Sequence, residues 1–407
     1  MSKCFRLALL VGLCCTSCGC ASLQAGATTV RLSVLPPSAP IGEPLRIVVT
    51  GLSPHTLITV RATTTDYQNR GWSSVATYRS NKSGQVDLST TAPLSGSYHV
   101  PDSGGLLWSL TAVNPSDTAS QFLIGKGGFR VRLSVSVEGS VVATSSLIRR
   151  TVVPGESLRL VTMASAGLVG TLYLPHNAAP KLPAVVVLGG SGGGEDLLVA
   201  SALAGQGFPT LALAYFGEPG LPSCLCAIPL EYFAHALTWV KRQPKLAGRP
   251  VVLLGSSRGA EAALLVADSY PTDLSAVVLG SPTDEVNHPV GGYYNGSAWT
   301  LPGQGIPVGE KIPLSRVTMP VLIGAGGADE IWDSSDSASY IMSNLPKTSP
   351  GSSASVHVNL TYANAGHEFV APPYVPYDVK GRGGTEEGNQ LALEAFWPRL
   401  TAFLASH

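Results

Sequence analysis

Five short, continuous runs of apolar residues in the second half of the chain constrain its fold more than any other feature. The runs are residues 184–188, 209–214, 251–254, 276–279 and 321–323. Continuous apolar residues are typical of strands buried on both faces, as in a parallel sheet. Segments with a helical pattern lie at 197–205, 230–242, 260–268 and 389–405. This alternation predicts a doubly wound, mostly parallel α/β domain.

Residues 28–152 have a different pattern, in which apolar and polar residues alternate over short stretches. Alternation with a period of two is typical of strands with one buried face. The clearest stretches are 30–34, 45–49, 57–63 and 129–135. About seven strands at this spacing predict an Ig-like antiparallel β-sandwich without helices. We therefore expect a β-sandwich domain over residues 28–152 and an α/β domain over residues 153–407.

The first 27 residues are typical of a leader that directs export. Lys3 and Arg6 precede an apolar stretch at 7–15 that is too short to span a membrane. Residues 25–27 (AGA) offer a cleavage site, whereas residues 17–20 loosely resemble the site of lipid attachment in a bacterial lipoprotein. We expect an exported protein, either released in soluble form or held by a lipid anchor, without a membrane-spanning segment after the leader.

Composition limits the classes of partner and cofactor. Lys and Arg total 26, as do Asp and Glu, so the charge balance indicates neither a nucleic-acid-binding surface nor a strongly charged partner. Only Cys224 and Cys226 of the seven cysteines lie beyond the leader. A bond across their single intervening residue would be strained, and two thiols are too few for a metal site. We expect no metal, no organic cofactor and no catalytic cysteine.

A serine nucleophile is predicted by the motif Gly-x-Ser-x-Gly, which marks a sharp turn from a strand into a helix. The motif centred on Ser257 follows the apolar run 251–254 and opens into a strong helix former at 260–265. Gly255 and Gly259 permit the tight turn, where a Cβ would clash. Ser257 is therefore the candidate nucleophile.

The same motif occurs a second time, centred on Ser191, and predicts a different role. It lies in a glycine-rich loop after the apolar run 184–188. α/β-Hydrolases place part of the oxyanion hole in this loop, and the rest at the residue after the nucleophile. We therefore expect an oxyanion hole made by backbone N–H groups of Gly190, Ser191, Gly192 and Arg258. The side chain of Arg258 is expected either to offer a charge to an anionic substrate such as CoA or to be a solvated surface group.

An acid should follow the nucleophile along the chain, because α/β-hydrolases place their triad in the order serine, acid, histidine. Asp329 lies in a glycine-rich loop after the apolar run 321–323, where a carboxylate can reach a histidine. Glu330, Asp333 and Asp336 are the alternatives. Asp333 is the main one, although it is also placed to cap a helix.

Position in the chain and local structure reduce the histidines that could serve as the base of the triad to one. Only His357 and His367 follow the acid without being terminal. His357 lies within an alternating strand at 355–361, whereas His367 lies in a loop. A catalytic base needs a position above the sheet within hydrogen-bond reach of the serine. We therefore expect His367 to be the base.

Several longer stretches match a known family in the family's own order. They are residues 104–110, 170–175, 190–194, 203–208, 213–216, 230–233, 255–261, 366–367 and 372–374. On these stretches the chain resembles the acyl-CoA thioesterase / bile acid-CoA:amino acid N-acyltransferase family, which joins an N-terminal β-sandwich to a C-terminal α/β-hydrolase domain. The family's serine, acid and histidine fall on Ser257, Asp329 and His367, and Trp332 and Ser334 support the alignment of the acid.

The resemblance implies hydrolysis of a small-molecule acyl thioester through an acyl-enzyme, with Ser257, Asp329 and His367 as the triad. Amidating transferases of the family carry cysteine at the position of Ser257, so hydrolysis is favoured over transfer to an amine. The leader favours an alternative, an exported carboxylesterase or dienelactone-hydrolase-like esterase. An acyl-CoA:amine N-acyltransferase is a further alternative. A binding protein with an inactive hydrolase domain is disfavoured by the ordered triad.

Overall fold

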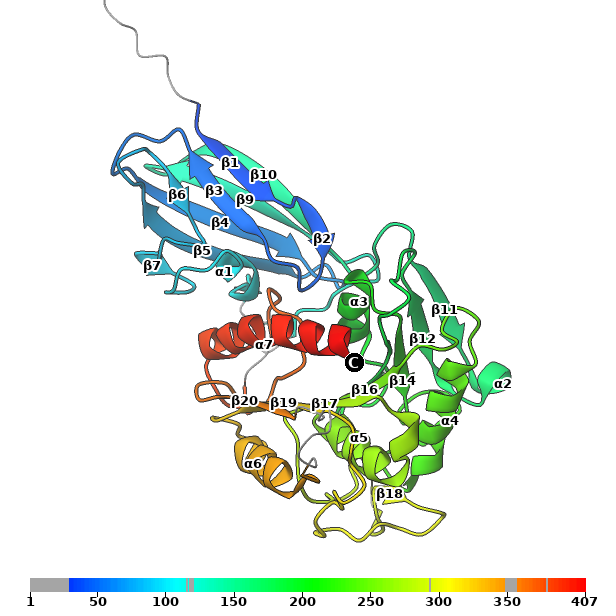
Figure 1. The fold of residues 1–407 in the computed structure, drawn as a ribbon. Coiled ribbons are helices and arrows are strands. Elements are labelled where there is room, and N and C mark those ends of the chain that lie inside the picture. Colours follow the sequence, from blue (N-terminus) through cyan, green and yellow to red (C-terminus); the bar gives the residue numbers. More distant parts are fainter. Residues whose placement is uncertain (1–28, 115, 117–120, 293, 348–356, 378–379) are drawn as a thin grey trace, which may run out of the picture.

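The computed structural model describes residues 29–407 except 115, 117–120, 293, 348–356 and 378–379. The predicted leader, residues 1–27, lies outside the described residues. A β-sandwich forms one end of the molecule and a larger α/β unit forms the other (Figure 1). Within the described part of the chain, no helix is both long enough and apolar enough to cross a membrane.

The sandwich consists of two sheets whose strands alternate buried and exposed residues, as the sequence pattern predicts. The smaller sheet has the order β1 (Arg31–Leu35), β3 (Arg46–Thr50), β6 (Val86–Asp87). The larger has the order β2 (Ser38–Pro40), β10 (Ser140–Arg150), β9 (Phe129–Val137), β4 (Leu57–Thr65), β5 (Gly71–Arg79), β7 (Ser95–Gly96), with β8 (Thr111–Ala112) also paired to β5.

The prediction of a wholly antiparallel, helix-free sandwich is wrong in two details. The pair β2 and β10 is parallel, and only Pro36 and Pro37 separate β1 from β2 in the chain. A helix, α1 (Gly105–Trp108), packs inside the sandwich, fixed by the hydroxyl of Ser74, which donates to the Leu106 carbonyl at 2.6 Å. A helix of four residues is about one turn long and therefore shows no periodicity in the sequence. Contacts with residues distant in the chain hold it in place.

The α/β unit is built on one eight-stranded sheet, which confirms the predicted α/β-hydrolase fold class. Its order is β11 (Ser157–Val161), β12 (Val169–Leu174), β14 (Thr210–Ala214), β13 (Ala184–Leu188), β16 (Val251–Ser256), β17 (Ala276–Gly280), β19 (Val321–Gly326), β20 (Val358–Tyr362). The strands from β14 to β20 are parallel, and β11, β12 and β14 pair antiparallel. The predicted strand at 355–361 instead begins at Val358, one residue after His357.

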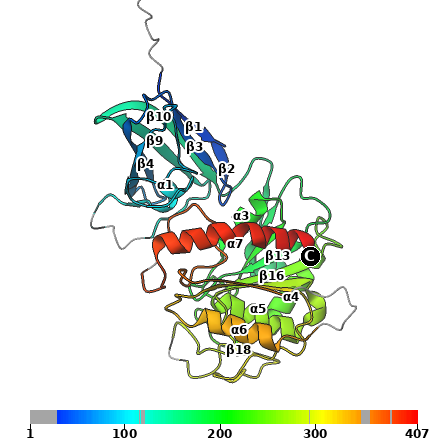
Figure 2. The ribbon, with the colours of Figure 1, turned by 60° about the vertical axis from the view of Figure 1, so that its left-hand side comes forward.

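Helices cover both faces of this sheet (Figure 2). One face carries α3 (Leu197–Gly205) and α7 (Glu386–Ser406), and the other carries α4 (Leu230–Lys241), α5 (Arg258–Ser269) and α6 (Ser334–Asn344). The remaining short elements are α2 (Met163–Ala166), a 3₁₀ turn at Pro271–Asp273, and β15 (Ile228–Pro229) paired with β18 (Trp299–Thr300). Coverage of both faces explains why the strands read as continuous apolar runs.

The two units share buried apolar contacts. Tyr374 and Val375, which precede α7, lie in the hydrophobic core of the sandwich. A Cβ on Gly42 would approach the indole nitrogen of Trp397 on α7 to 3.2 Å.

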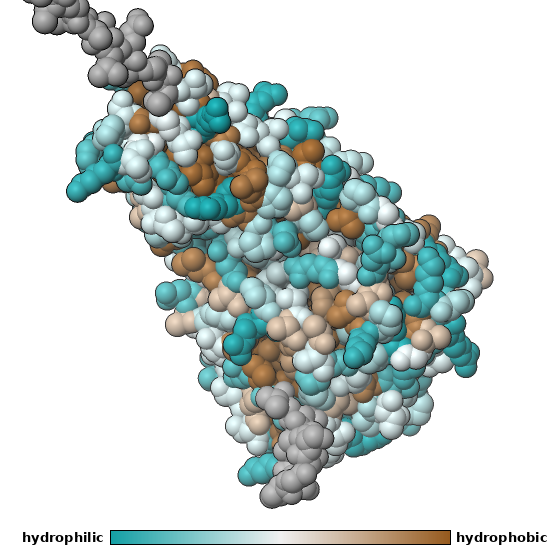
Figure 3. Space-filling view, turned by 45° about the horizontal axis from the view of Figure 1, so that its top comes forward, coloured by the Kyte–Doolittle hydropathy of each residue, from teal (hydrophilic) through white to brown (hydrophobic). Residues whose placement is uncertain are grey.

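On the surface, Figure 3 shows apolar residues in several separate patches among polar ones. Val141 on β10 is an exposed apolar side chain of the kind common on protein surfaces.

A pair of carboxyl groups also lies where the sandwich meets α7. Asp102 is buried and accepts hydrogen bonds from the backbone N–H of Gly104, at 2.7 Å, and from the indole N–H of Trp108. Glu394 on α7 is half-buried beside it. Burial, followed by the charge of Asp102 and a hydrogen bond to it, raises the pKa of Glu394 from 4.5 to about 9.

We expect Glu394→Gln to stabilise the protein in alkaline solution. Since the folded-state pKa of Glu394 exceeds the unfolded one, the folded state binds more protons, and stability is lost as pH rises from 4.5 toward 9. Glutamine is neutral at every pH, so the free energy of unfolding should increase by about 2 kcal/mol at pH 8 and change far less at pH 5. Urea denaturation at both pH values measures this. The exposed Glu310→Gln is the control, and equal changes at both pH values would contradict the prediction.

Candidate active site

Ser257 occupies a strained turn between β16 and α5, as a nucleophile elbow requires. Its φ of 56° and ψ of −121° are unfavourable for a residue with a side chain. The backbone is crowded on both sides. A Cβ on Gly255 would lie 2.1 Å from the carbonyl oxygen of Gly259, and one on Gly259 would lie 2.4 Å from that of Leu188. Both glycines are therefore needed by close backbone approach, as predicted.

Three predicted site residues are joined by hydrogen bonds. The hydroxyl of Ser257 lies 2.8 Å from Nε2 of His367. Nδ1 of His367 lies 2.8 Å and 3.0 Å from the two carboxylate oxygens of Asp329. Because an ionised carboxylate can only accept, Nδ1 carries the proton and Nε2 is left to accept from the serine hydroxyl. This is the arrangement in which a histidine can act as a general base.

The three side chains come from the carboxyl ends of different strands. Ser257 follows β16, Asp329 follows β19 and His367 follows β20. His367 is 6% exposed and the side chain of Asp329 is 1% exposed, whereas Ser257 is partly open to solvent. Asp329 and His367 are thus shielded from water, while the hydroxyl of Ser257 is accessible from the solvent.

Further contacts, which were not predicted from the sequence, hold His367 in place. The ring of Trp332 packs edge-on against that of His367, with 4.8 Å between centroids. The indole N–H of Trp332 donates to the carbonyls of Ser281 and Pro282 at 3.2 and 3.0 Å. The hydroxyl of Ser281 donates to the carbonyl of His367 at 2.5 Å. Ser281 follows β17 directly and has a positive φ of 45°, and its position at a strand end was the available signal.

The alternative acid, Asp333, is engaged elsewhere. It caps the N-terminus of α6, accepting from the backbone N–H of Asp336 and the hydroxyl of Ser335, both at 2.9 Å. The hydrogen bond from the Asp336 N–H has the largest effect in lowering the pKa of the Asp333 carboxyl, and the bond from the Ser335 hydroxyl lowers it further. The helix-capping interpretation of Asp333 is therefore confirmed.

The glycine-rich loop after β13 lies against Ser257. A Cβ on Gly190 would lie 3.5 Å from the hydroxyl oxygen of Ser257. The phenol of Tyr215 donates to the carbonyl of Gly189 at 2.6 Å and so helps to fix the loop. Gly190, Ser191, Gly192 and Arg258 line the same cavity as Ser257 and His367, with a volume of about 640 Å³. Their role as an oxyanion hole stays a prediction.

The side chain of Arg258 corrects the sequence interpretation. It is 4% exposed, not a solvated surface group. Its guanidinium pairs with Glu261 at 2.9 Å and donates to the carbonyls of His288 and Asn287 at 2.8 and 3.2 Å. Its interaction with an anionic substrate stays a prediction. Burial lowers the pKa of Arg258 and raises that of Glu261, and their attraction opposes both shifts. The pairing of Arg258 with Glu261 was not predicted from the sequence. Their spacing of about one helical turn could have indicated it, because residues three apart lie on the same face of a helix.

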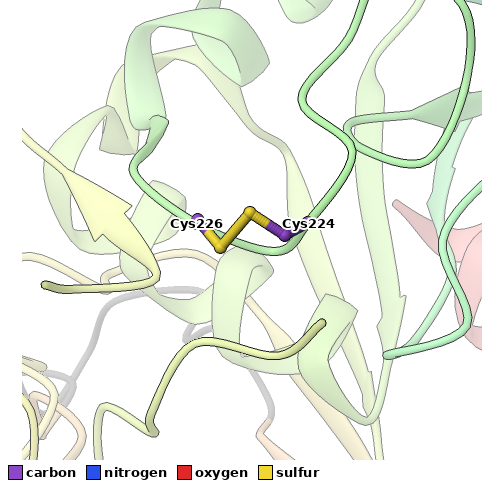
Figure 4. The surroundings of a disulfide bond; sticks show 2 residues. All are labelled: Cys224 and Cys226. Atoms are coloured by element: carbon purple, nitrogen blue, oxygen red, sulfur yellow. A yellow bond between two sulfur atoms is a disulfide. The ribbon is translucent and has the colours of Figure 1, made fainter. Parts of the chain in front are cut away.

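Cys224 and Cys226 form a disulfide, with 5.3 Å between their Cα atoms (Figure 4). The spacing of one residue between the two cysteines predicts a strained bond but does not exclude it. Among the described residues, no group of three or more His, Cys, Asp or Glu side chains could hold a metal ion.

Comparison with known families agrees with this architecture. The model for the acyl-CoA thioester hydrolase/BAAT N-terminal region matches residues 42–161. The model for the BAAT / acyl-CoA thioester hydrolase C terminal matches residues 228–298 and 298–407. The chain belongs to the acyl-CoA thioesterase / bile acid-CoA:amino acid N-acyltransferase family. The predicted family is thereby confirmed.

Relatives within the acyl-CoA thioesterase / N-acyltransferase family span almost the whole chain. Acyl-coenzyme A thioesterase 5 of Mus musculus is 29% identical over 410 residues, covering 90% of this chain and 93% of the relative. Bile acid-CoA:amino acid N-acyltransferase of Mus musculus is 27% identical over 423 residues, covering 93% and 97%. A solved α/β hydrolase enzyme from a Medee basin deep-sea metagenome library is 17% identical with a TM-score of 0.42, covering 63% of this chain and all 100% of that one.

Proposed function

We propose that this chain hydrolyses acyl thioesters, acyl-CoA among them, through a Ser257–His367–Asp329 triad and an acyl-enzyme. The observation that carries the proposal is the continuous set of hydrogen bonds from the serine hydroxyl through the imidazole to the carboxylate. Membership of a family that contains acyl-CoA thioesterases supports the thioester as substrate.

In the proposed first step, Ser257 Oγ attacks the thioester carbonyl carbon while His367 Nε2 takes the hydroxyl proton. Asp329 holds the opposite N–H and stabilises the imidazolium that forms. The oxyanion is held by backbone N–H groups of Arg258 and of the loop Gly190–Gly192. Collapse of the tetrahedral intermediate expels the thiolate, which receives the proton from His367 and leaves an acyl group on the serine.

In the second step water takes the place of the thiol. His367 removes a proton from water as it attacks the acyl-serine carbonyl, and returns that proton to Ser257 Oγ as the free acid leaves. The net reaction consumes one thioester and one water, and yields one thiol and one carboxylic acid. The proposed steps use no metal and no organic cofactor.

Two other acyl transfers are candidates because specific observations favour them. The predicted export leader favours an oxygen-ester substrate, since acyl-CoA is scarce outside the cytoplasm. Relatives named as N-acyltransferases favour an amine acceptor in place of water. Ser257 argues against the amine, because an oxygen ester on serine is a poorer acyl donor to amines than a thioester on cysteine.

The thioester proposal predicts a clear substrate preference. We expect kcat/KM for acyl-CoA thioesters to exceed that for p-nitrophenyl esters of matched chain length by about tenfold or more, a difference of about 1.4 kcal/mol in transition-state binding. Addition of glycine or taurine should leave the free acid as the product. Preference for the oxygen esters would instead indicate the exported esterase, and formation of an N-acyl amide would indicate the transferase.

A further inference from the structure

One wall of the catalytic cavity is a short segment that reaches it from outside the catalytic strands. The cavity is lined on apolar positions by Val290, Ile331 and Trp332. Ile331 and Trp332 lie two and three residues after Asp329, but Val290 lies in the long connection between β17 and β18. We refer to residues 287–292 as the Val290 segment. Since no strand or helix contains it, its position must be set by other contacts.

The first of these contacts is a two-way backbone bridge to Leu225. The N–H of Leu225 donates to the carbonyl of Val290 at 2.9 Å, and the N–H of Val290 donates back to the carbonyl of Leu225 at 3.3 Å. Leu225 itself is fully buried in the hydrophobic core of the α/β unit. The bridge therefore ties the cavity wall to a fixed point.

Leu225 is the single residue enclosed by the Cys224–Cys226 disulfide (Figure 4). The backbone N–H of Cys226 also donates to the carbonyl of Cys224 at 2.9 Å, so the small ring is closed twice. Side-chain positions on Gly291 and Gly292 would lie 3.7 and 3.8 Å from Cys224 Cβ, which places the Val290 segment in contact with this ring. A ring this short restricts the unfolded chain little, so its main effect is local. It fixes the backbone that Leu225 presents to Val290.

The second anchor is the buried pair of Arg258 and Glu261 on α5. Arg258 donates to the carbonyls of Asn287 and His288, and Glu261 accepts the N–H of Asn287 at 2.9 Å. Glu261 is completely buried and also accepts the indole N–H of Trp299 at 2.7 Å. Because Arg258 directly follows Ser257, this anchor joins the start of the Val290 segment to the nucleophile elbow, while the disulfide ring holds its end.

We propose that the Cys224–Cys226 disulfide is a positioning element that holds the Val290 segment as a wall of the acyl site, and that Val290 sets which acyl chains are accepted. Val290 is 37% exposed, so its side chain is available to a bound chain. The inference rests on the proposed acyl transfer for its specificity part, but the positioning part concerns the structure alone.

Two substitutions test the specificity part. We expect Val290→Ala to reduce kcat/KM about fivefold for the best acyl-CoA, since apolar contact is lost. Val290→Phe should narrow the site and cut kcat/KM about tenfold for long chains while affecting acetyl-CoA less, thus shifting the chain-length optimum. Val141→Ala, on the sandwich surface, should leave the chain-length profile unchanged. A profile that is identical in all four proteins would overturn the role of Val290.

The disulfide is tested by a double variant, Cys224→Ser/Cys226→Ser, and by a phosphine reductant on the wild-type protein. Both should raise KM for acyl-CoA about five- to tenfold with kcat changed less than about threefold, since the triad itself stays in place. The reductant should have no further effect on the double variant. A reduced protein with unaltered KM would count against the positioning role.

Hydrogen exchange separates this inference from the proposed function. Peptides covering residues 287–292 should exchange faster in the double variant and in the reduced wild type, whereas peptides from the core strand β16 should not change. If wild-type protein hydrolyses no acyl-CoA, the proposed function fails, yet exchange still decides the positioning role. Unchanged exchange at residues 287–292 would overturn that role whatever the activity.

Discussion

Alanine in place of Ser257 should lower kcat/KM for an acyl thioester by about 10⁴- to 10⁶-fold. The hydroxyl oxygen lies 2.8 Å from Nε2 of His367, so its removal takes away both the nucleophile and the proton that the base would accept. Alanine retains the Cβ, and the elbow already holds a side chain at a φ of 56°, so the turn should persist. Steady-state hydrolysis and labelling by a fluorophosphonate measure the loss, and the variant should take up no label.

Two other serine variants make this result interpretable. Ser343→Ala, on the exposed surface of α6, should be labelled at the wild-type rate. Ser191→Ala tests the second Gly-x-Ser-x-Gly motif and keeps its backbone N–H, so it should retain labelling. If Ser191→Ala abolished labelling while Ser257→Ala did not, the nucleophile would be misassigned.

Asparagine in place of Asp329 should lower kcat by about 10³- to 10⁴-fold with little change in KM. The carboxylate accepts a hydrogen bond from the Nδ1–H of His367 at 2.8 Å and so leaves Nε2 free to accept. An asparagine amide can turn its NH₂ group toward Nδ1, which favours the opposite tautomer and disables the base. Substrate binding does not depend on this proton, so the loss should appear in kcat. Single-turnover hydrolysis of acyl-CoA separates the two constants.

Asp333→Asn is the matched control, since Asp333 was the main alternative acid. Asparagine is as good a helix N-cap as aspartate, so α6 should keep its cap and stability should change by less than about 0.5 kcal/mol. Activity should stay within about twofold of wild type, because Asp333 hydrogen-bonds within α6 rather than to His367. A large loss of kcat in Asp333→Asn together with a normal Asp329→Asn would reverse the assignment of the acid.

Local sequence patterns were sufficient to predict those elements whose structure depends mainly on neighbouring residues. The segment 197–205 was predicted as a helix and forms α3 over the same residues, capped by Asp196. The run 184–188 was predicted as a strand and forms β13. The elbow at Ser257 could be predicted because a buried strand, two glycines and a helix former must lie adjacent in the chain for it to form.

Features that depend on partners distant in the chain could not be predicted in this way. Arg258 is buried because Asn287, His288 and Trp299 enclose it, and nothing near Arg258 in the sequence indicates those residues. Tyr374 packs into the core of the sandwich, more than two hundred residues away from its strands. The same holds for the contact of Glu394 with Asp102, which joins the two units.

The central claim is that an acyl group passes from a thioester to Ser257, and mass spectrometry of a quenched reaction tests it most directly. Acyl-CoA is mixed with a stoichiometric amount of the enzyme, the reaction is stopped in acid within milliseconds, and the peptides are mapped. The account predicts a burst of free thiol matched by one acyl group on the peptide containing Ser257, absent from Ser257→Ala. Thiol release without an adduct on that peptide, or with an adduct on another residue, would contradict it.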